Sequence, residues 1–236
     1  MFGYAAELVE RYPTIYAGVI RIAGVANGSS SPEILCQYRA EQESVAGRLE
    51  GSAIADLPSI AAWRRAFAAF GAKPTQYRSA PEALLRRLTK QGDIPSINAL
   101  VDVGNLVSIR YALPIAAFDL ASIDPPITAR FAEGDERFTD LGSSESVHPD
   151  PGEVVFVDRQ GLVCARRWCC RQSAQSATSE ASTGALVVIE GLDENAAQDV
   201  ENALANLISL LAAYQPEAEV ESFRLSASAP SAGESS

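Results

Sequence analysis

Residues 96–109 read SINALVDVGNLVSI, and this stretch decides the fold. Its apolar residues fall on nearly every side of a helix, which predicts a helix that is buried all round. Asn98, Asp102 and Asn105 nevertheless recur at i, i+4 and i+7 and form one polar stripe. A buried carboxylate must be hydrogen-bonded or it is strongly destabilising, so we expect Asp102 to bond to the two amides. The stripe either braces neighbouring loops or lines a polar pocket, and both interpretations stay open.

Helices are predicted on both sides of this stretch. Four are expected in the first 90 residues, at 5–11, 33–49, 56–70 and 82–90. Ser96 is expected to cap the helix over 97–110, and Pro114 to enforce its exit. Another helix is expected to be capped by Asp193, because four apolar residues recur on one face, namely Val200, Leu204, Leu207 and Leu211.

Short strands are predicted mainly in the second half of the chain. The expected strands are 16–25, 115–120, 127–131, 153–157, 162–165 and 185–189. The turn residues between 157 and 162 indicate a hairpin. The pattern predicts an α+β fold in which helices pack on a mixed or antiparallel sheet. We expect a strand–helix unit over 1–50 packed on the core, a main domain over 51–225, and a disordered tail over 226–236.

Composition excludes several kinds of chemistry. The chain has a net charge of −11, four cysteines without a C-x-x-C pair, and one histidine, His148, beside prolines. This predicts no metal site and no cofactor, and makes a serine triad improbable. The N-terminus lacks the basic start of a signal peptide, and no apolar run is long enough for a membrane span. We therefore expect a cytoplasmic protein with no membrane partner.

Two further segments offer binding groups. Residues 166–173 read RRWCCRQS, and strand alternation would place Trp168 on the face opposite Arg171. With Gln172 and Ser173, they could bind a flat or anionic ligand by stacking and forked hydrogen bonds. The simpler alternative is that this segment is the end of a strand and that its arginines are exposed to solvent. Glu190 ends the apolar strand and either faces a cleft or emerges into solvent.

Several of these motifs resemble one family in the same order. Residues 96–107 resemble the "INxxVDxxN" helix of the editing (B3/B4) domain in the bacterial phenylalanyl-tRNA synthetase beta subunit. Residues 113–120 look like the "PxxxxD" strand that follows it there. Residues 152–158 and 167–173, and the strand that ends at Glu190, are similar to free-standing members of that family. The resemblance covers about residues 50–192.

The resemblance implies a deacylase that hydrolyses mischarged aminoacyl-tRNA without a metal. It implies that Glu190 recognises the hydroxyl of a tyrosyl group. Together with the residue patterns above, we expect the substrate-binding residues to be Asn98, Asp102, Asn105, Trp168, Arg171, Gln172, Ser173 and Glu190. No catalytic residue is assigned, and the chain lacks the modules that charge a tRNA. Ala116 replaces a histidine of the synthetase strand. The alternatives are a non-catalytic protein that binds tRNA ends or an amino-acid-like metabolite, and a purely structural role for the stripe.

Overall fold

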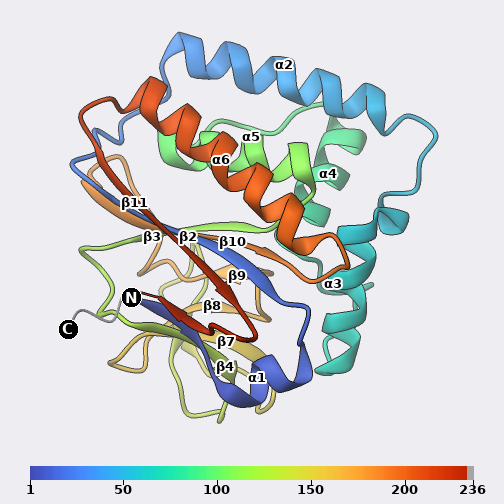
Figure 1. The fold of residues 1–236 in the computed structure, drawn as a ribbon, viewed down its shortest axis with the longest axis vertical. Coiled ribbons are helices and arrows are strands. Elements are labelled where there is room, and N and C mark those ends of the chain that lie inside the picture. Colours follow the sequence, from blue (N-terminus) through green and yellow to red (C-terminus); the bar gives the residue numbers. More distant parts are fainter. Residues whose placement is uncertain (233–236) are drawn as a thin grey trace.

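The chain forms three layers, shown in Figure 1 by a computed structural model that describes residues 1–232. Helices cover one face of a four-stranded sheet, and a six-stranded sheet covers its other face. Antiparallel pairing dominates, and one parallel pair makes the larger sheet mixed. The α+β prediction is confirmed. No helix among the described residues combines the length and apolar character needed to cross a bilayer.

The four-stranded sheet forms the middle layer. Its strands, in spatial order, are β11 (Glu219–Ser226), β2 (Tyr16–Ala23), β10 (Gly184–Gly191) and β3 (Ile115–Asp119). Successive side chains of β10 alternate between faces, so Val187 packs with the helices whereas Val188 packs toward the larger sheet. Glu190 is two residues beyond Val188 and therefore points toward the larger sheet.

The larger sheet combines strands from distant parts of the chain. Its order is β12 (Ser231–Ala232), β1 (Phe2–Tyr4), β4 (Ile127–Phe131), β7 (Val154–Val157), β8 (Val163–Arg166) and β9 (Arg171–Gln172). β1 and β4 are the parallel pair. A separate short pair consists of β5 (Phe138–Thr139) and β6 (Ser146–Val147). This arrangement places the N-terminal strand beneath the end of β10, where Tyr4 reaches Glu190.

The helical layer is built around α5. The helices of this layer are α2 (Pro32–Arg48), α4 (Ala80–Gln91), α5 (Ala99–Tyr111) and α6 (Ala196–Tyr214). Outside it, α1 (Ala6–Arg11) contacts β4, α3 (Pro58–Ala69) packs mainly with the core of the larger sheet, and a 3-10 turn at Ile54–Asp56 precedes α3. α5 contacts α2, α4 and α6 as well as β3. Nine of its residues are buried, which confirms the prediction of a helix buried all round.

Two predicted helix caps are wrong by a few residues. Asn98, not Ser96, caps α5, because its side chain accepts a hydrogen bond from the Val101 backbone N–H. The Ser96 hydroxyl instead donates to Asp102. α6 begins after Asn195, and the Asp193 carboxylate accepts from the Asn195 N–H in the preceding turn. In both cases the side chain expected to cap the helix bonds to another group, so it does not accept from the N–H groups of the helix end.

The C-terminal segment takes part in the larger sheet, contrary to the expected disorder. The expected disordered tail includes β12, which pairs with β1, and the Met1 ammonium donates to the Ala232 carbonyl at 2.8 Å. Backbone pairing needs no apolar side chain, so the Ala/Ser-rich composition was misleading there. Residues 233–236 lie outside the described residues. The 1–50 segment contains a strand and a helix, β2 and α2, and β2 is an inner strand of the four-stranded sheet.

Candidate functional site

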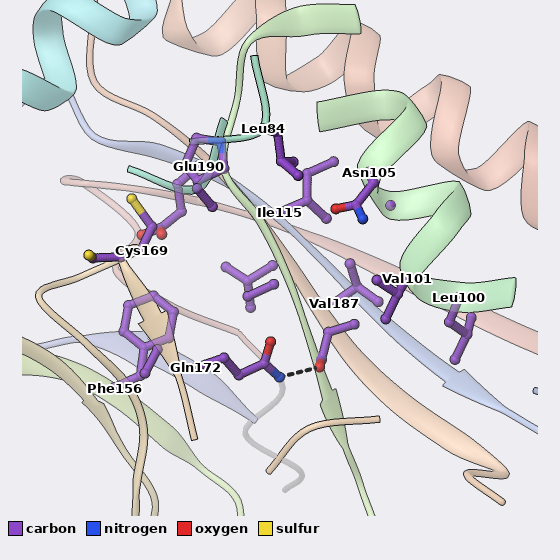
Figure 2. A pocket seen from close by; sticks show the side chains of 18 of the residues that line it. Leu84, Leu100, Val101, Asn105, Ile115, Phe156, Cys169, Gln172, Val187 and Glu190 are labelled. Carbon is purple, nitrogen blue, oxygen red and sulfur yellow. Dashed lines mark hydrogen bonds between the residues drawn. The ribbon is translucent and has the colours of Figure 1, made fainter. Parts of the chain in front are cut away.

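A cavity of about 370 Å³ opens beside β3, the edge strand of the four-stranded sheet. Most of its wall comes from α4, α5, β3, β10 and the segment after β8, and α6, β2 and β7 contribute single apolar side chains or pairs of them. Figure 2 shows Glu190, Cys169 and Phe156 on one side of it and Leu100, Val101 and Asn105 on the other. Most lining residues are apolar, and the polar or charged ones are Arg87, Asn105, Arg171, Gln172 and Glu190. The cavity therefore suits a small, mainly apolar group with a few polar atoms.

Glu190 is the buried carboxyl of this cavity. Its Oε1 accepts two hydrogen bonds, from the Tyr4 hydroxyl at 2.8 Å and from the Trp168 indole N–H at 3.0 Å. No described residue forms an ion pair with it, and none donates to Oε2. Burial raises the pKa of Glu190 to about 7, although the two hydrogen bonds act in the opposite direction. The carboxyl thus changes its protonation state near neutral pH, with one oxygen not used by the protein.

The indole reaches Glu190 because the chain turns sharply after β8. Arg167 and Trp168 both have left-handed backbone angles, with φ of 45° and 60°. The predicted strand alternation is therefore wrong here, and Trp168 points into the core instead of continuing one face of a strand. Its ring packs edge-on against Trp63 with the centroids 5.1 Å apart. The Arg166 side chain makes a bidentate ion pair with buried Glu153, at 2.8 and 2.9 Å, which holds the start of the turn.

The remaining residues of the 166–173 segment separate into three environments. The Gln172 amide lines the cavity and donates to the Ala117 carbonyl of β3 at 2.7 Å. A dashed line at Gln172 in Figure 2 marks this bond. Arg171 lines the rim with 60% of its side chain exposed, and its nearest acidic partner, Asp140, is 3.9 Å away. Ser173 is fully buried outside the cavity, where its hydroxyl accepts from the Gln175 backbone N–H.

The polar stripe of α5 divides between structure and cavity. The Asp102 carboxylate accepts from the hydroxyls of Ser30 and Ser96 and from the Ile97 N–H. The expected bonds to the two amides are absent among the described contacts, because those side chains point elsewhere. Asn98 caps α5 and donates to the Thr178 carbonyl at 3.3 Å. Only Asn105 of the three lines the cavity.

The structure adds residues in and next to the cavity wall that the sequence did not indicate. Tyr4 completes the Glu190 hydrogen bonds from 186 positions away, a pairing without any local sequence signal. Cys169 and Cys170 line the wall, and burial raises the pKa of both thiols. They therefore stay protonated, which makes them poor nucleophiles. His148 lies outside the wall, with its Nδ1 2.7 Å from the Glu136 carbonyl oxygen.

Curated relatives match parts of this chain. The phenylalanine–tRNA ligase beta subunit of Aliivibrio fischeri is 40% identical over 72 residues, which are 30% of this chain and 9% of that protein. The corresponding subunit of Shewanella oneidensis is 30% identical over 93 residues, 39% of this chain and 12% of that protein. The matched segments thus amount to a small part of these ligase subunits.

A solved structure is similar over nearly the whole chain. It is an N-terminal fragment of the phenylalanyl-tRNA synthetase beta subunit from Pyrococcus horikoshii, with a TM-score of 0.50 and 13% sequence identity. The similarity covers 95% of this chain and 53% of that one, and at this identity it shows the fold. The family described as "B3/4 domain" matches residues 62–215, which is more than half of the chain. The chain therefore belongs to the B3/4 domain family.

Proposed function

We propose that this chain binds the aminoacylated 3′ end of a tRNA in the cavity and hydrolyses the ester of a mischarged amino acid in trans. Membership of the B3/4 family and the similarity to phenylalanine–tRNA ligase beta subunits support a tRNA-associated role. The cavity is large enough for one amino-acid side chain and mainly apolar, as an aromatic or similar group requires.

Glu190 is the observation on which the proposal rests. Tyr4 and Trp168 both donate to Oε1, which leaves Oε2 for a group in the cavity. In its charged form this oxygen accepts a hydrogen bond from a hydroxyl or ammonium group of the ligand. A buried carboxyl that binds a hydroxyl favours the hydroxylated ligand strongly, since a plain analogue leaves the carboxyl unpaired.

The reaction itself needs little from the protein beyond positioning. Water adds to the ester carbonyl, the bond to the ribose oxygen breaks, and a proton passes to that oxygen. The described cavity wall contains no serine or histidine, and its thiols are protonated. We therefore propose that polar groups of the wall and the terminal hydroxyls of the tRNA hold the attacking water next to the ester carbonyl. This positioning is what accelerates hydrolysis.

The second candidate is a non-catalytic protein that binds a tRNA end or an amino-acid-like metabolite. One observation favours it: Ala116 lines the cavity with only a methyl group, at the position that the resemblance matches to a histidine of the synthetase strand. That position offers no proton acceptor, so a cavity that binds without hydrolysing is chemically reasonable.

The test compares tyrosyl and phenylalanyl esters on one tRNA, with the wild-type protein and Glu190→Ala. We expect wild type to prefer the tyrosyl ester, and the variant to reduce this preference by about tenfold or more while it retains part of the turnover. Glu221→Ala, which removes an exposed carboxylate on β11, is the matched control and should change neither quantity.

Other outcomes give other conclusions. Equal preferences for wild type and Glu190→Ala would remove Glu190 from recognition. Loss of turnover on both esters, with the variant still folded, would assign Glu190 to positioning the water. Failure of wild type to hydrolyse any mischarged tRNA in a panel would overturn hydrolysis, and calorimetric binding of the same amino acids would then support the second candidate.

A further inference from the structure

Positive charge is concentrated in one part of this acidic chain. Seven of the 19 basic residues, but only one of the 30 acidic residues, fall between positions 57 and 92. This segment therefore has a net charge of +6, and the rest of the chain has a net charge of −17. It contains α3 and α4, the second of which forms one wall of the cavity.

Three arginines of this segment converge on one buried carboxylate. The Oε1 atom of Glu82 lies 2.8 Å from Arg64 Nη1, 2.8 Å from Arg86 Nε and 4.0 Å from Arg78 Nε. The carboxylate is fully buried, whereas 27–43% of each arginine side chain is exposed. One negative charge neutralises only one of the three guanidinium groups. The cluster thus presents two excess positive charges whose positions are held by the core.

The cluster is close to the cavity. Glu82 and Arg86 lie on α4, and their neighbours Ala83 and Arg87 on the same helix line the cavity. The Ala80 backbone N–H, at the start of α4, donates to the Cys169 carbonyl of the cavity wall at 2.9 Å. Arg65, Lys73 and Lys90 add exposed positive charges without an ion-pair partner among residues 1–232.

We propose that these side chains form a binding surface for the phosphodiester backbone of an RNA whose 3′ end occupies the cavity. We call it the α3–α4 basic surface, and it consists of Arg64, Arg65, Lys73, Arg78, Arg86 and Lys90. The proposal rests on the proposed function of the cavity. Guanidinium forks match phosphate oxygens, and arginines already held in place lose less freedom on binding.

RNA fits these observations better than an acidic protein does. The ligand must combine a polyanion, for the basic surface, with a small end group that enters a cavity of about 370 Å³. An aminoacylated RNA end has both features. The net charge of −17 on the rest of the chain repels a polyanion, so approach is favoured at this face and should weaken steeply with salt.

The test measures binding of uncharged tRNA by fluorescence anisotropy across a salt series. The first variant is Arg78→Gln/Arg86→Gln, in which Glu82 keeps Arg64 as a partner. The second variant, Arg65→Gln/Lys90→Gln, removes charges that form no ion pair with any residue of the described range 1–232, and so carries little risk to folding. The control is Arg224→Gln, which removes an ion-paired arginine of similar exposure, 44%, on β11.

We expect each double variant to weaken tRNA binding about tenfold at low salt and to reduce the salt slope by about two. Hydrolysis of a short ester, an aminoacyl-adenosine without the tRNA body, should be unchanged, and the control should match wild type. Affinity within twofold of wild type, with an unchanged slope in both double variants, would overturn the proposal. So would binding of wild type to polyglutamate but not to tRNA.

The two proposals can fail separately. If no ester is hydrolysed but both double variants lose tRNA affinity and salt slope, the basic surface stands and the hydrolytic function does not. If the tRNA ester is hydrolysed with the same KM by wild type and both double variants, the hydrolytic function stands and the basic surface does not.

Discussion

Asp102 and Glu190 are both buried carboxyls, but their surroundings differ. Asp102 lies in the first turn of α5 and receives hydrogen bonds on both oxygens, from Ser30 and Ser96 and from the Ile97 N–H. Glu190 lies at the end of β10 and receives bonds from Tyr4 and Trp168 on one oxygen only. A buried polar group whose oxygens are all used within the protein braces the fold. One that keeps an oxygen unused beside a cavity is available to a ligand.

Removing Asp102 should have the largest effect. Asp102→Ala leaves two hydroxyls and one backbone N–H without their acceptor. Because Ser96 and Ile97 are exposed, water replaces part of the lost bonding, and we expect the free energy of unfolding to fall by about 3 kcal/mol. Urea unfolding measures this, with Asp193→Ala, an exposed turn carboxylate, as the control. A loss below about 1 kcal/mol, together with loss of ligand binding, would contradict the bracing role.

Glu190→Gln should change how the free energy of unfolding depends on pH. The folded protein keeps a proton on Glu190 up to a pKa of about 7, whereas the unfolded chain releases it near 4.5. Stability from this group is therefore fully present below about pH 4.5 and is lost as pH rises through 7, by about 3 kcal/mol in total. The glutamine amide oxygen can still accept both hydrogen bonds but does not titrate.

Urea unfolding at pH 5 and pH 8 measures that difference. Wild type should lose more stability between these two pH values than Glu190→Gln does, and the variant should be the more stable protein at pH 8. A pH-dependent decline of equal size in both proteins would show that other groups cause it. Glu221→Gln serves as the control for a change of net charge.

The smallest effects on stability are expected from replacing the two asparagines of the stripe, Asn98 and Asn105, and the two replacements should differ. Asn98→Ala removes the cap of α5 and a bond to the Thr178 carbonyl, so we expect a loss of about 1–2 kcal/mol. Asn105→Ala should lower the free energy of unfolding by less than about 1 kcal/mol, because the half-buried side chain lines the cavity. It should, however, weaken ligand binding. Thermal unfolding and ligand titration of both variants test this. Equal stability losses would mean that the stripe is structural throughout.

The strongest periodic patterns predicted their elements well. The helices expected at 33–49 and 82–90 occur at Pro32–Arg48 and Ala80–Gln91, and the strand expected at 185–189 is the core of β10. These elements bury apolar side chains, and the spacing of those apolar residues can be read from the sequence. β11 and β12 escaped prediction because they lie at sheet edges, and their stability comes from backbone pairing with β2 and β1.

The cavity could be predicted only in part. Five of the eight predicted binding residues line it, namely Asn105, Trp168, Arg171, Gln172 and Glu190, and their binding role stays a prediction. Asn98, Asp102 and Ser173 lie outside its wall. Spacing along α5 shows which side chains share a face but not which loop donors surround them. The contribution of Tyr4 depends on the parallel pairing of β1 with β4, which no local pattern indicates.

The left-handed turn at Arg167 and Trp168 limits what a protein engineer can change. Each left-handed residue costs about 1–2 kcal/mol relative to glycine, so glycine would ordinarily be the stabilising replacement. Here, glycine at 167 would remove the guanidinium that lies 4.0 Å over the Tyr77 ring, and glycine at 168 would remove the indole bond to Glu190. Branched residues would fit this backbone even less well. The turn should therefore be left unaltered in any stabilised version of the protein.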